Sequence, residues 1–255
     1  MSLGFIERPI ATTTRSIQGI NTEVFEPTIF AYTAKFPKQR IFYLNVGMAF
    51  FHSLLLIATL SIGKLDLTIP IYMTNITFTQ NQNSTPAAPA FELVPTYTLY
   101  GNVYLTIVTA AFFLCSAIAH AGNASLWRRF YEHELSICRV TTRWVEYFVS
   151  ASIMIFIIAF NAGIREYLLL WGITFLIAST MPFGLLTEIY ARPASDNEWK
   201  QPLSIRLLFH VLGYIPQLSA WFLILMNFYS EKIRDPPAFV YGIIWGQLAL
   251  FFSFG

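Results

Sequence analysis

One carboxylate lies inside a segment that is otherwise apolar enough to cross a membrane. It is Glu146, in the stretch RWVEYFVSASIM at residues 143–154. An ionised side chain at the bilayer centre costs about 2.5–3.5 kcal/mol, so such residues usually have a partner and a function. Glu146 could hold a positive charge or a proton, and the Ser150 hydroxyl on the same helix face could donate to it. The alternative is an ion pair with Arg143 at the helix end.

Three histidines and a second carboxylate lie in other apolar segments: His52, His120, His210 and Glu188. Histidine changes its charge near neutral pH, so two histidines on adjacent helices with a carboxylate on the next could carry a proton. Taken singly, each histidine is more often a core side chain with satisfied hydrogen bonds. Glu188 can likewise pair with Arg192, four residues later.

Other kinds of site are not indicated by the motifs. The sequence has no His-Glu-x-x-His and only two cysteines without metal-ligand spacing, so we expect no metal site. It has neither a Gly-x-Ser-x-Gly elbow nor a Gly-rich phosphate loop, so we expect no catalytic residues and no enzyme. The formal net charge of +2 is too small to favour nucleic acid as a partner.

The composition predicts an integral membrane protein. Of the 255 residues, 55% are hydrophobic and 12% are charged, whereas a soluble domain is about 25% charged. A spanning helix needs about 20 mainly apolar residues. Such segments occupy residues 41–63, 99–121, 141–164, 167–191, 205–229 and 237–255. We therefore predict an all-α bundle with six membrane helices in this chain, kinked at Pro182 and Pro216.

The basic residues predict the orientation, because Lys and Arg gather in cytoplasmic loops. With the N-terminus inside, the inner loops hold Lys35, Lys38, Arg40, Arg128, Arg129, Arg139, Arg192 and Lys200. The outer loops hold Lys64, Arg165, Lys232 and Arg234. No signal peptide is evident. We predict a multi-pass protein in membrane lipid, with residues 1–40 as a cytoplasmic tail.

The long loop at residues 64–98 is the exception to the helical pattern. Its stretch IPIYMTNITFT places apolar residues in near-alternating order, which predicts a short β-hairpin. Two glycosylation acceptor triplets begin at Asn75 and Asn83, on the predicted outer side. A third, at Asn123, falls on the predicted inner side and should be silent.

Several stretches together resemble one family. RWVEYFVSASIM, with its Arg-Trp-x-Glu-Tyr lead, resembles the third-helix signature of the heliorhodopsins, retinal proteins whose N-terminus faces the cytoplasm. Agreement extends to NVGMAFFHSLL, SAIAH, FGLLTE, GYIP and FVYGIIWGQLALFFSFG in the other helices. The resemblance covers roughly residues 40–255. It implies a seven-helix rhodopsin domain from residue 41 onward that binds all-trans retinal as a Schiff base.

The resemblance also implies roles for individual residues. Glu146 would be the counterion of the protonated Schiff base, with Ser116 and Ser150 near it. His52 and His120 would line an inner polar cavity that holds the released proton. The retinal pocket would include Tyr147, Met181, Gly184 and Pro216. The hairpin would match the family's outer-loop sheet, which helps to form a homodimer.

The chain departs from the family in two places. Pro216 is followed by Gln217, where the family commonly has Trp. Every lysine, at positions 35, 38, 64, 200 and 232, lies outside the apolar segments. Because a retinal protein needs a buried lysine for the Schiff base, we predict a seventh helix carrying that lysine after Gly255.

Three functions follow as hypotheses. The leading one is a light sensor, in which retinal isomerisation and loss of the Schiff-base proton signal to an unidentified cytoplasmic partner. The alternative is a light-driven proton transporter or channel, with Glu188 and His210 as further relay members. The third is a membrane enzyme or structural protein without a chromophore.

Overall fold

The computed structural model describes residues 5–6, 33–34, 37–80, 91–136, 139–191, 204, 207–230 and 237–253. Within them, the helices long and apolar enough to cross a membrane are α1 (Lys38–Ile62), α2 (Leu105–Ala124), α4 (Thr141–Asn161), α5 (Tyr167–Ala191) and α7 (Leu208–Ser230). A shorter apolar helix, α8, spans Ala238–Ser253. Strands β1 (Phe5–Ile6) and β2 (Thr33–Ala34) form a small antiparallel pair. The predicted tail lies mostly outside the described residues, as do Asn83 and Arg192.

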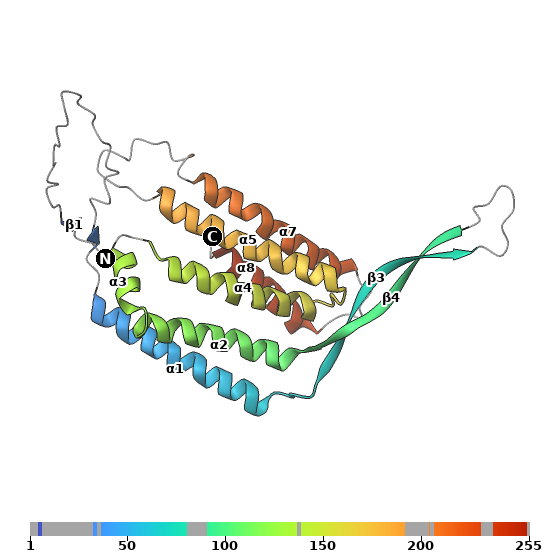
Figure 1. Ribbon diagram of the computed structural model, residues 1–255, viewed down its shortest axis with the longest axis horizontal. Coiled ribbons are helices and arrows are strands. Elements are labelled where there is room, and N and C mark those ends of the chain that lie inside the picture. The colour runs from blue at the N-terminus through green and yellow to red at the C-terminus, as the bar shows by residue number, and fades with distance from the viewer. Residues whose placement is uncertain are drawn as a thin grey trace, which may run out of the picture.

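The helices form one bundle in which neighbours in the chain are neighbours in space (Figure 1). α1 packs on α2, α2 on α4, α4 on α5, and α5 on α7. The described helix pattern therefore confirms an all-α membrane bundle. In lipid the backbone must satisfy its own hydrogen bonds, which favours helices for these apolar segments. α5 and α7 continue through Pro182 and Pro216.

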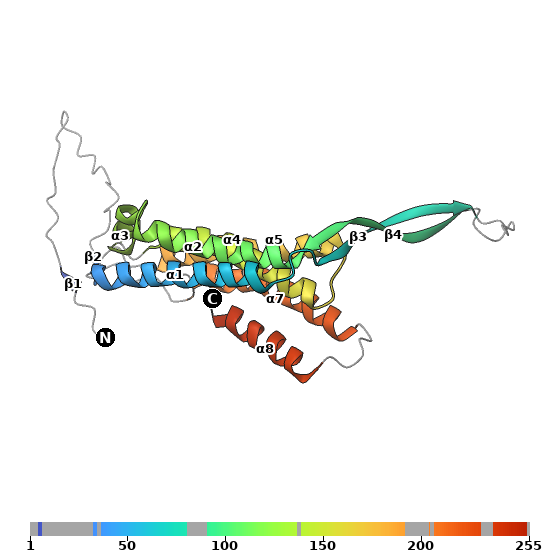
Figure 2. The same ribbon diagram turned by 90° about the horizontal axis from the view of Figure 1, so that it is seen from below.

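The buried core lies mainly between α4, α5 and α7, and its most enclosed side chains include Ile155, Phe160, Ile173, Ile177, Trp221 and Ile224. α8 lies at an angle to the bundle (Figure 2). It contacts α7 through aromatic rings: Trp221 meets Phe251 at a centroid distance of 5.5 Å, and Phe228 meets Tyr241 at 5.4 Å. The same core thus joins helices from the middle and the end of the chain.

The predicted hairpin is confirmed, but it is longer than expected. β3 (Thr68–Gln80) pairs antiparallel with β4 (Phe91–Tyr104). The predicted second span, 99–121, is therefore wrong at its start, because residues 99–104 belong to β4. Gly101 and Asn102 are poor helix formers, whereas the neighbouring Tyr and Val residues favour strands. Their pairing with the first residues of β3 decides the conformation.

The base of the hairpin is fixed to the start of α5. A register shift between Ile71 and Tyr72 leaves Tyr100 free to stack on Tyr167, with ring centroids 3.8 Å apart. The Tyr72 backbone N–H donates to the Arg165 carbonyl at 2.9 Å. Glu166 accepts from the Leu169 N–H at 2.6 Å and so caps α5. Beyond this anchor the hairpin extends away from the bundle (Figure 1).

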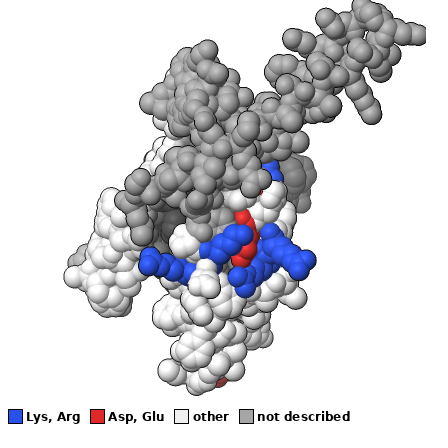
Figure 3. Space-filling model, turned by 90° about the vertical axis from the view of Figure 1, so that its left-hand side faces the viewer, with Lys and Arg blue, Asp and Glu red and all other residues white. Residues whose placement is uncertain are grey.

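A short helix that the hydropathy pattern did not predict, α3 (Arg128–Ser136), follows α2. Arg128 donates to Glu132 at 2.7 Å and lies 4.5 Å above the Phe42 ring of α1. This hydrogen bond lowers the pKa of Glu132, and Lys38 adds an ion pair at 3.6 Å. Lys and Arg side chains therefore gather around acidic ones at this end of the molecule (Figure 3). We call this end of the molecule, which contains α3 and Lys38, the α3 end.

Candidate functional site

The carboxyl group of Glu146 lies between α4 and α2. Its side chain is half-buried, and the hydroxyl of the buried Ser116 on α2 reaches it. In the part of the chain that the structure describes, Glu146 forms no ion pair with Lys, Arg or His. Ser150 is also buried on α4. A carboxylate that is withdrawn from water without a cation is costly, so the site fits a positively charged group.

The alternative prediction, an ion pair between Glu146 and Arg143, is wrong. Arg143, one turn earlier on α4, forms an ion pair with Glu188 of α5 instead. Glu188 also accepts a hydrogen bond from the Val140 N–H at 3.1 Å. The side chains of Arg143 and Glu188 therefore connect the start of α4 to the end of α5. Glu146 remains the carboxylate that faces α2.

A second polar group lies between α1 and α2. The rings of His52 on α1 and His120 on α2 are parallel within 7°, with centroids 5.7 Å apart. Nδ1 of His120 lies 2.9 Å from Oδ1 of Asn45, which is 6% exposed. Nδ1 of His52 is buried and has no hydrogen-bond partner among the described residues. The structure thus brings together the two histidines that the sequence had paired.

Asn45 was missed by the sequence reasoning, although a signal was present. It lies seven residues before His52, two helical turns away and so on the same face of α1. On α2, Ser116 lies four residues before His120, again on one face. One stripe of α2 therefore carries both the contact with Glu146 and the contact with Asn45.

His210 does not join this group through any described contact. Its ring lies edge-on to Tyr214 of its own helix, α7, at a centroid distance of 5.1 Å. Glu188 is held by Arg143 and Val140 at the α3 end. The structure therefore separates the two further relay candidates from the cluster of Glu146, Ser116 and the histidines.

Several of the predicted pocket residues meet where α4 packs on α5. The Trp144 ring lies against Gly184, and Tyr147 meets Trp144 edge-on at 6.2 Å. Met181 is 8% exposed and belongs to the same core. The sequence reasoning missed Trp144, which its position inside the RWVEY stretch could have suggested. Its indole N–H is buried and finds no hydrogen-bond acceptor in the part of the chain that the structure describes.

The α7 side of the core contains Pro216 and a second indole with an unpartnered N–H. Trp221 is 1% exposed, and no described residue accepts a hydrogen bond from its Nε1. Gln217 donates from Nε2 to the Phe251 carbonyl at 2.8 Å. This hydrogen bond joins α7 to α8. Pro216 is half-buried beside it.

Replacing Gly184 with Ala is expected to destabilise the protein. A Cβ at this position would lie 2.0 Å from Cζ3 of Trp144, so the indole must move. Overpacking of this kind costs about 1–3 kcal/mol, which thermal unfolding would measure. Gly172→Ala is the matched control on the same helix, because a Cβ there would have no atom of the described residues within 4 Å. Equal unfolding temperatures for the two variants would contradict the contact.

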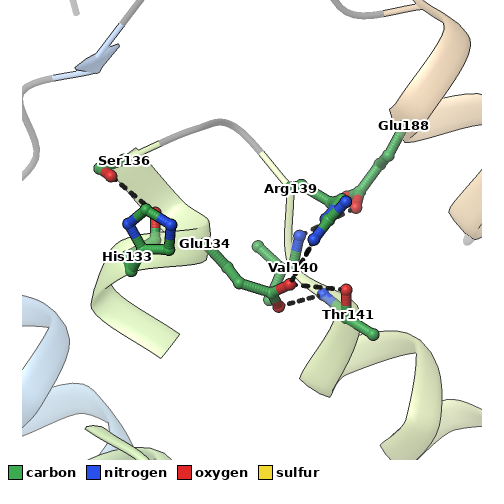
Figure 4. A network of polar contacts seen from close by, with 7 residues as sticks. All are labelled: His133, Glu134, Ser136, Arg139, Val140, Thr141 and Glu188. Atoms are coloured by element: carbon green, nitrogen blue, oxygen red, sulfur yellow. Dashed lines mark hydrogen bonds and ion pairs between the residues drawn. The ribbon is translucent and has the colours of Figure 1, made fainter. Parts of the chain in front are cut away.

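At the α3 end, a buried carboxylate closes the start of α4. Glu134 is 1% exposed and accepts from the Thr141 backbone N–H at 2.6 Å and the Thr141 hydroxyl at 2.7 Å. Arg139 forms an ion pair with it at 3.3 Å. Figure 4 shows Glu134 directed from α3 toward Arg139 and Thr141, with Glu188 approaching Val140 from α5. Three helices therefore meet in one polar network.

The described lysines, Lys38 and Lys64, lie at the two ends of α1 rather than inside the bundle. The lysine predicted after Gly255 lies outside the described residues. Within these residues, no group of three or more His, Cys, Asp or Glu side chains could hold a metal ion.

Comparison with known proteins gives a family for most of the chain. A search among curated proteins found no match. The family model described as Heliorhodopsin matches residues 41–255, which is most of the chain and includes every site residue named above. The chain belongs to the heliorhodopsin family.

Proposed function

We propose that the protein is a light sensor in which Glu146 is the counterion of a protonated retinal Schiff base. Membership of the family implies a retinal-binding rhodopsin whose chromophore is bound to a lysine. The observation that carries the proposal is the position of Glu146, which is half-buried beside Ser116 and has no ion-pair partner among the described residues. A cation placed there would remove the cost of the unpaired charge.

The apolar side chains of the core fit the hydrocarbon part of retinal, as Glu146 fits the charge of the Schiff base. Met181 and Trp221 belong to one apolar core cluster against which Trp144 packs, and apolar and aromatic side chains of this kind line cofactor pockets. When bound, all-trans retinal would supply visible absorption and a light-driven change of shape. Glu146 would hold the positive charge, and Ser116 would orient the carboxylate through its hydroxyl.

The histidines would hold a proton after light absorption. His52 and His120 lie parallel between α1 and α2, and the α2 face that carries His120 also carries Ser116. Neutral imidazole can take up a proton at a ring nitrogen near physiological pH. The stripe on α2 thus offers a short route from the carboxylate to the histidine pair.

The signal would leave through α4. Glu146 lies three residues after Arg143 on this helix, and Arg143 holds α5 through Glu188. A charge change at Glu146 could therefore bias the network of Glu134, Arg139 and Glu188 at the α3 end. This end would face an unidentified cytoplasmic partner, and its basic side chains support a cytoplasmic orientation (Figure 3).

The sensor is favoured over a light-driven proton transporter because Glu188 is engaged by Arg143 and Val140. A transporter needs a route to both faces of the membrane. Cells expressing the full-length protein should show no sustained photocurrent under steady light. A sustained current that Glu188→Gln abolishes, with the colour unchanged, would establish transport instead.

A homodimer through the hairpin is part of the proposal. Large apolar side chains are exposed along both strands, including Ile76, Phe78, Phe91, Leu93 and Tyr97. Exposed apolar surface of this extent marks an interaction site. The protein would therefore work as a pair of subunits in membrane lipid, without catalytic residues of its own.

A further inference from the structure

The contact between Asn45 and His120 determines which ring nitrogen of His120 carries a hydrogen. The Asn45 amide lies between two partners: its Nδ2 donates to the Ile41 carbonyl at 3.0 Å, and its Oδ1 faces Nδ1 of His120 at 2.9 Å. Asn45 is 6% exposed, so water has little access to this amide. The orientation of the amide is therefore set by protein groups.

Only one arrangement of hydrogens satisfies both contacts. A backbone carbonyl can only accept a hydrogen bond, so the NH₂ end of the Asn45 amide must face Ile41. The opposite end is then the carbonyl oxygen, which also can only accept. Nδ1 of His120 must therefore carry the hydrogen. In the neutral ring, Nε2 is left as the nitrogen with a free lone pair.

The neighbouring histidine does not impose this choice. His52 stacks on His120 with its ring plane nearly parallel, a geometry that places face against face. Its Nδ1 is buried and makes no hydrogen bond to any residue that the structure describes. Asn45 is thus the described residue whose hydrogen bond distinguishes the two nitrogens of His120.

We propose that Asn45 is a positioning residue that holds neutral His120 with its hydrogen on Nδ1, so that Nε2 is the atom that takes up a proton. The tautomer follows from the contacts alone. The step of proton uptake rests on the proposed function. Asn45 acts through the imidazole and does not itself exchange a proton.

Nitrogen NMR of the full-length protein labelled with ¹⁵N-histidine tests the tautomer directly. The His120 signals are identified by their loss in His120→Asn. In the dark, at a pH where the ring is neutral, we expect a protonated Nδ1 and an unprotonated Nε2. The opposite pattern, with the hydrogen on Nε2, would overturn the proposal.

Two variants separate this effect from general damage to the structure. Asn45→Leu removes the acceptor and should shift the tautomer ratio of His120 by about tenfold toward the Nε2–H form, the size expected for one hydrogen bond. Asn45→Asp keeps an acceptor oxygen and should preserve the hydrogen on Nδ1. If Leu left the ratio unchanged, or if Asp altered it as Leu does, Asn45 would not be the positioning residue.

Asn227→Leu provides a matched control, since Asn227 on α7 also donates its amide to a backbone carbonyl, that of Ala162 just after α4, at 3.1 Å. It should leave the His120 signals unchanged, and a shift as large as that of Asn45→Leu would overturn the assignment. The tautomer can be measured without light or pigment. If the protein stayed colourless with retinal but His120 carried its hydrogen on Nδ1, the proposed function would be wrong and the assignment of the tautomer would still hold.

Discussion

Glu146→Gln is expected to move the visible absorption band of the retinal-bound protein to longer wavelength. A negative charge beside the Schiff base stabilises the ground state of retinal, in which the positive charge is localised at the Schiff-base end. Removing the carboxylate charge therefore narrows the energy gap between the ground state and the excited state. The site is withdrawn from water, so little screening weakens this effect. We rank this change as the largest spectral effect of any single substitution in the chain, and an absorption spectrum measures it.

Glu132→Gln, which changes a carboxylate outside the membrane helices, is the control for this result. Glu132→Gln removes the same charge from α3, outside the membrane helices, where Arg128 and Lys38 already pair with the group. Its band should stay in place. Glu188 cannot substitute for Glu146, because it is held by Arg143. If the visible absorption band of Glu146→Gln lay at the wild-type wavelength, Glu146 would not be the counterion.

Glu134→Ala is expected to cause the largest loss of stability among the changes considered. Glu134 is 1% exposed and accepts hydrogen bonds from Thr141 as well as an ion pair from Arg139. Its removal leaves the Arg139 guanidinium and both the backbone N–H and the hydroxyl of Thr141, at the start of α4, without this partner. Breaking a fully buried pair from one side costs about 3–5 kcal/mol, and because the Arg139 side chain is 33% exposed to water we expect a loss near the lower end of this range. Thermal unfolding of the purified protein in detergent would show it.

Glu132→Ala is the matched control, two residues away on the same short helix. The Glu132 side chain is 19% exposed, and its partners Arg128 and Lys38 are 40% and 63% exposed. Ion pairs near the surface contribute about 0–1 kcal/mol, so this variant should unfold close to the wild type. Similar losses in both variants would mean that the enclosure of Glu134 does not carry the stability of the α3 end.

The sequence predicted the parts of the fold that depend on composition. Apolar length alone located α1, α4, α5 and α7 to within a few residues. It misplaced the start of α2, since hydropathy measures how apolar a segment is and not whether it is helical. Residues 99–104 are apolar enough for a span, yet they pair with β3. α3 is too short and too polar to give a hydropathy signal.

The polar contacts of the site were harder to predict, because their partners are distant in sequence. Arg143 could be assigned to Glu146 by local spacing, but its partner, Glu188, lies 45 residues away. His120 and Asn45 are 75 residues apart. The residue types were visible in advance. Which of them meet depends on how α1, α2, α4 and α5 pack.

The central claim is that Glu146 faces a retinal Schiff base, and the absorption spectrum of the full-length protein incubated with all-trans retinal tests it most directly. We predict a new band in the visible range, formed as free retinal is consumed. A folded, helical protein that shows only the ultraviolet band of free retinal would contradict the account.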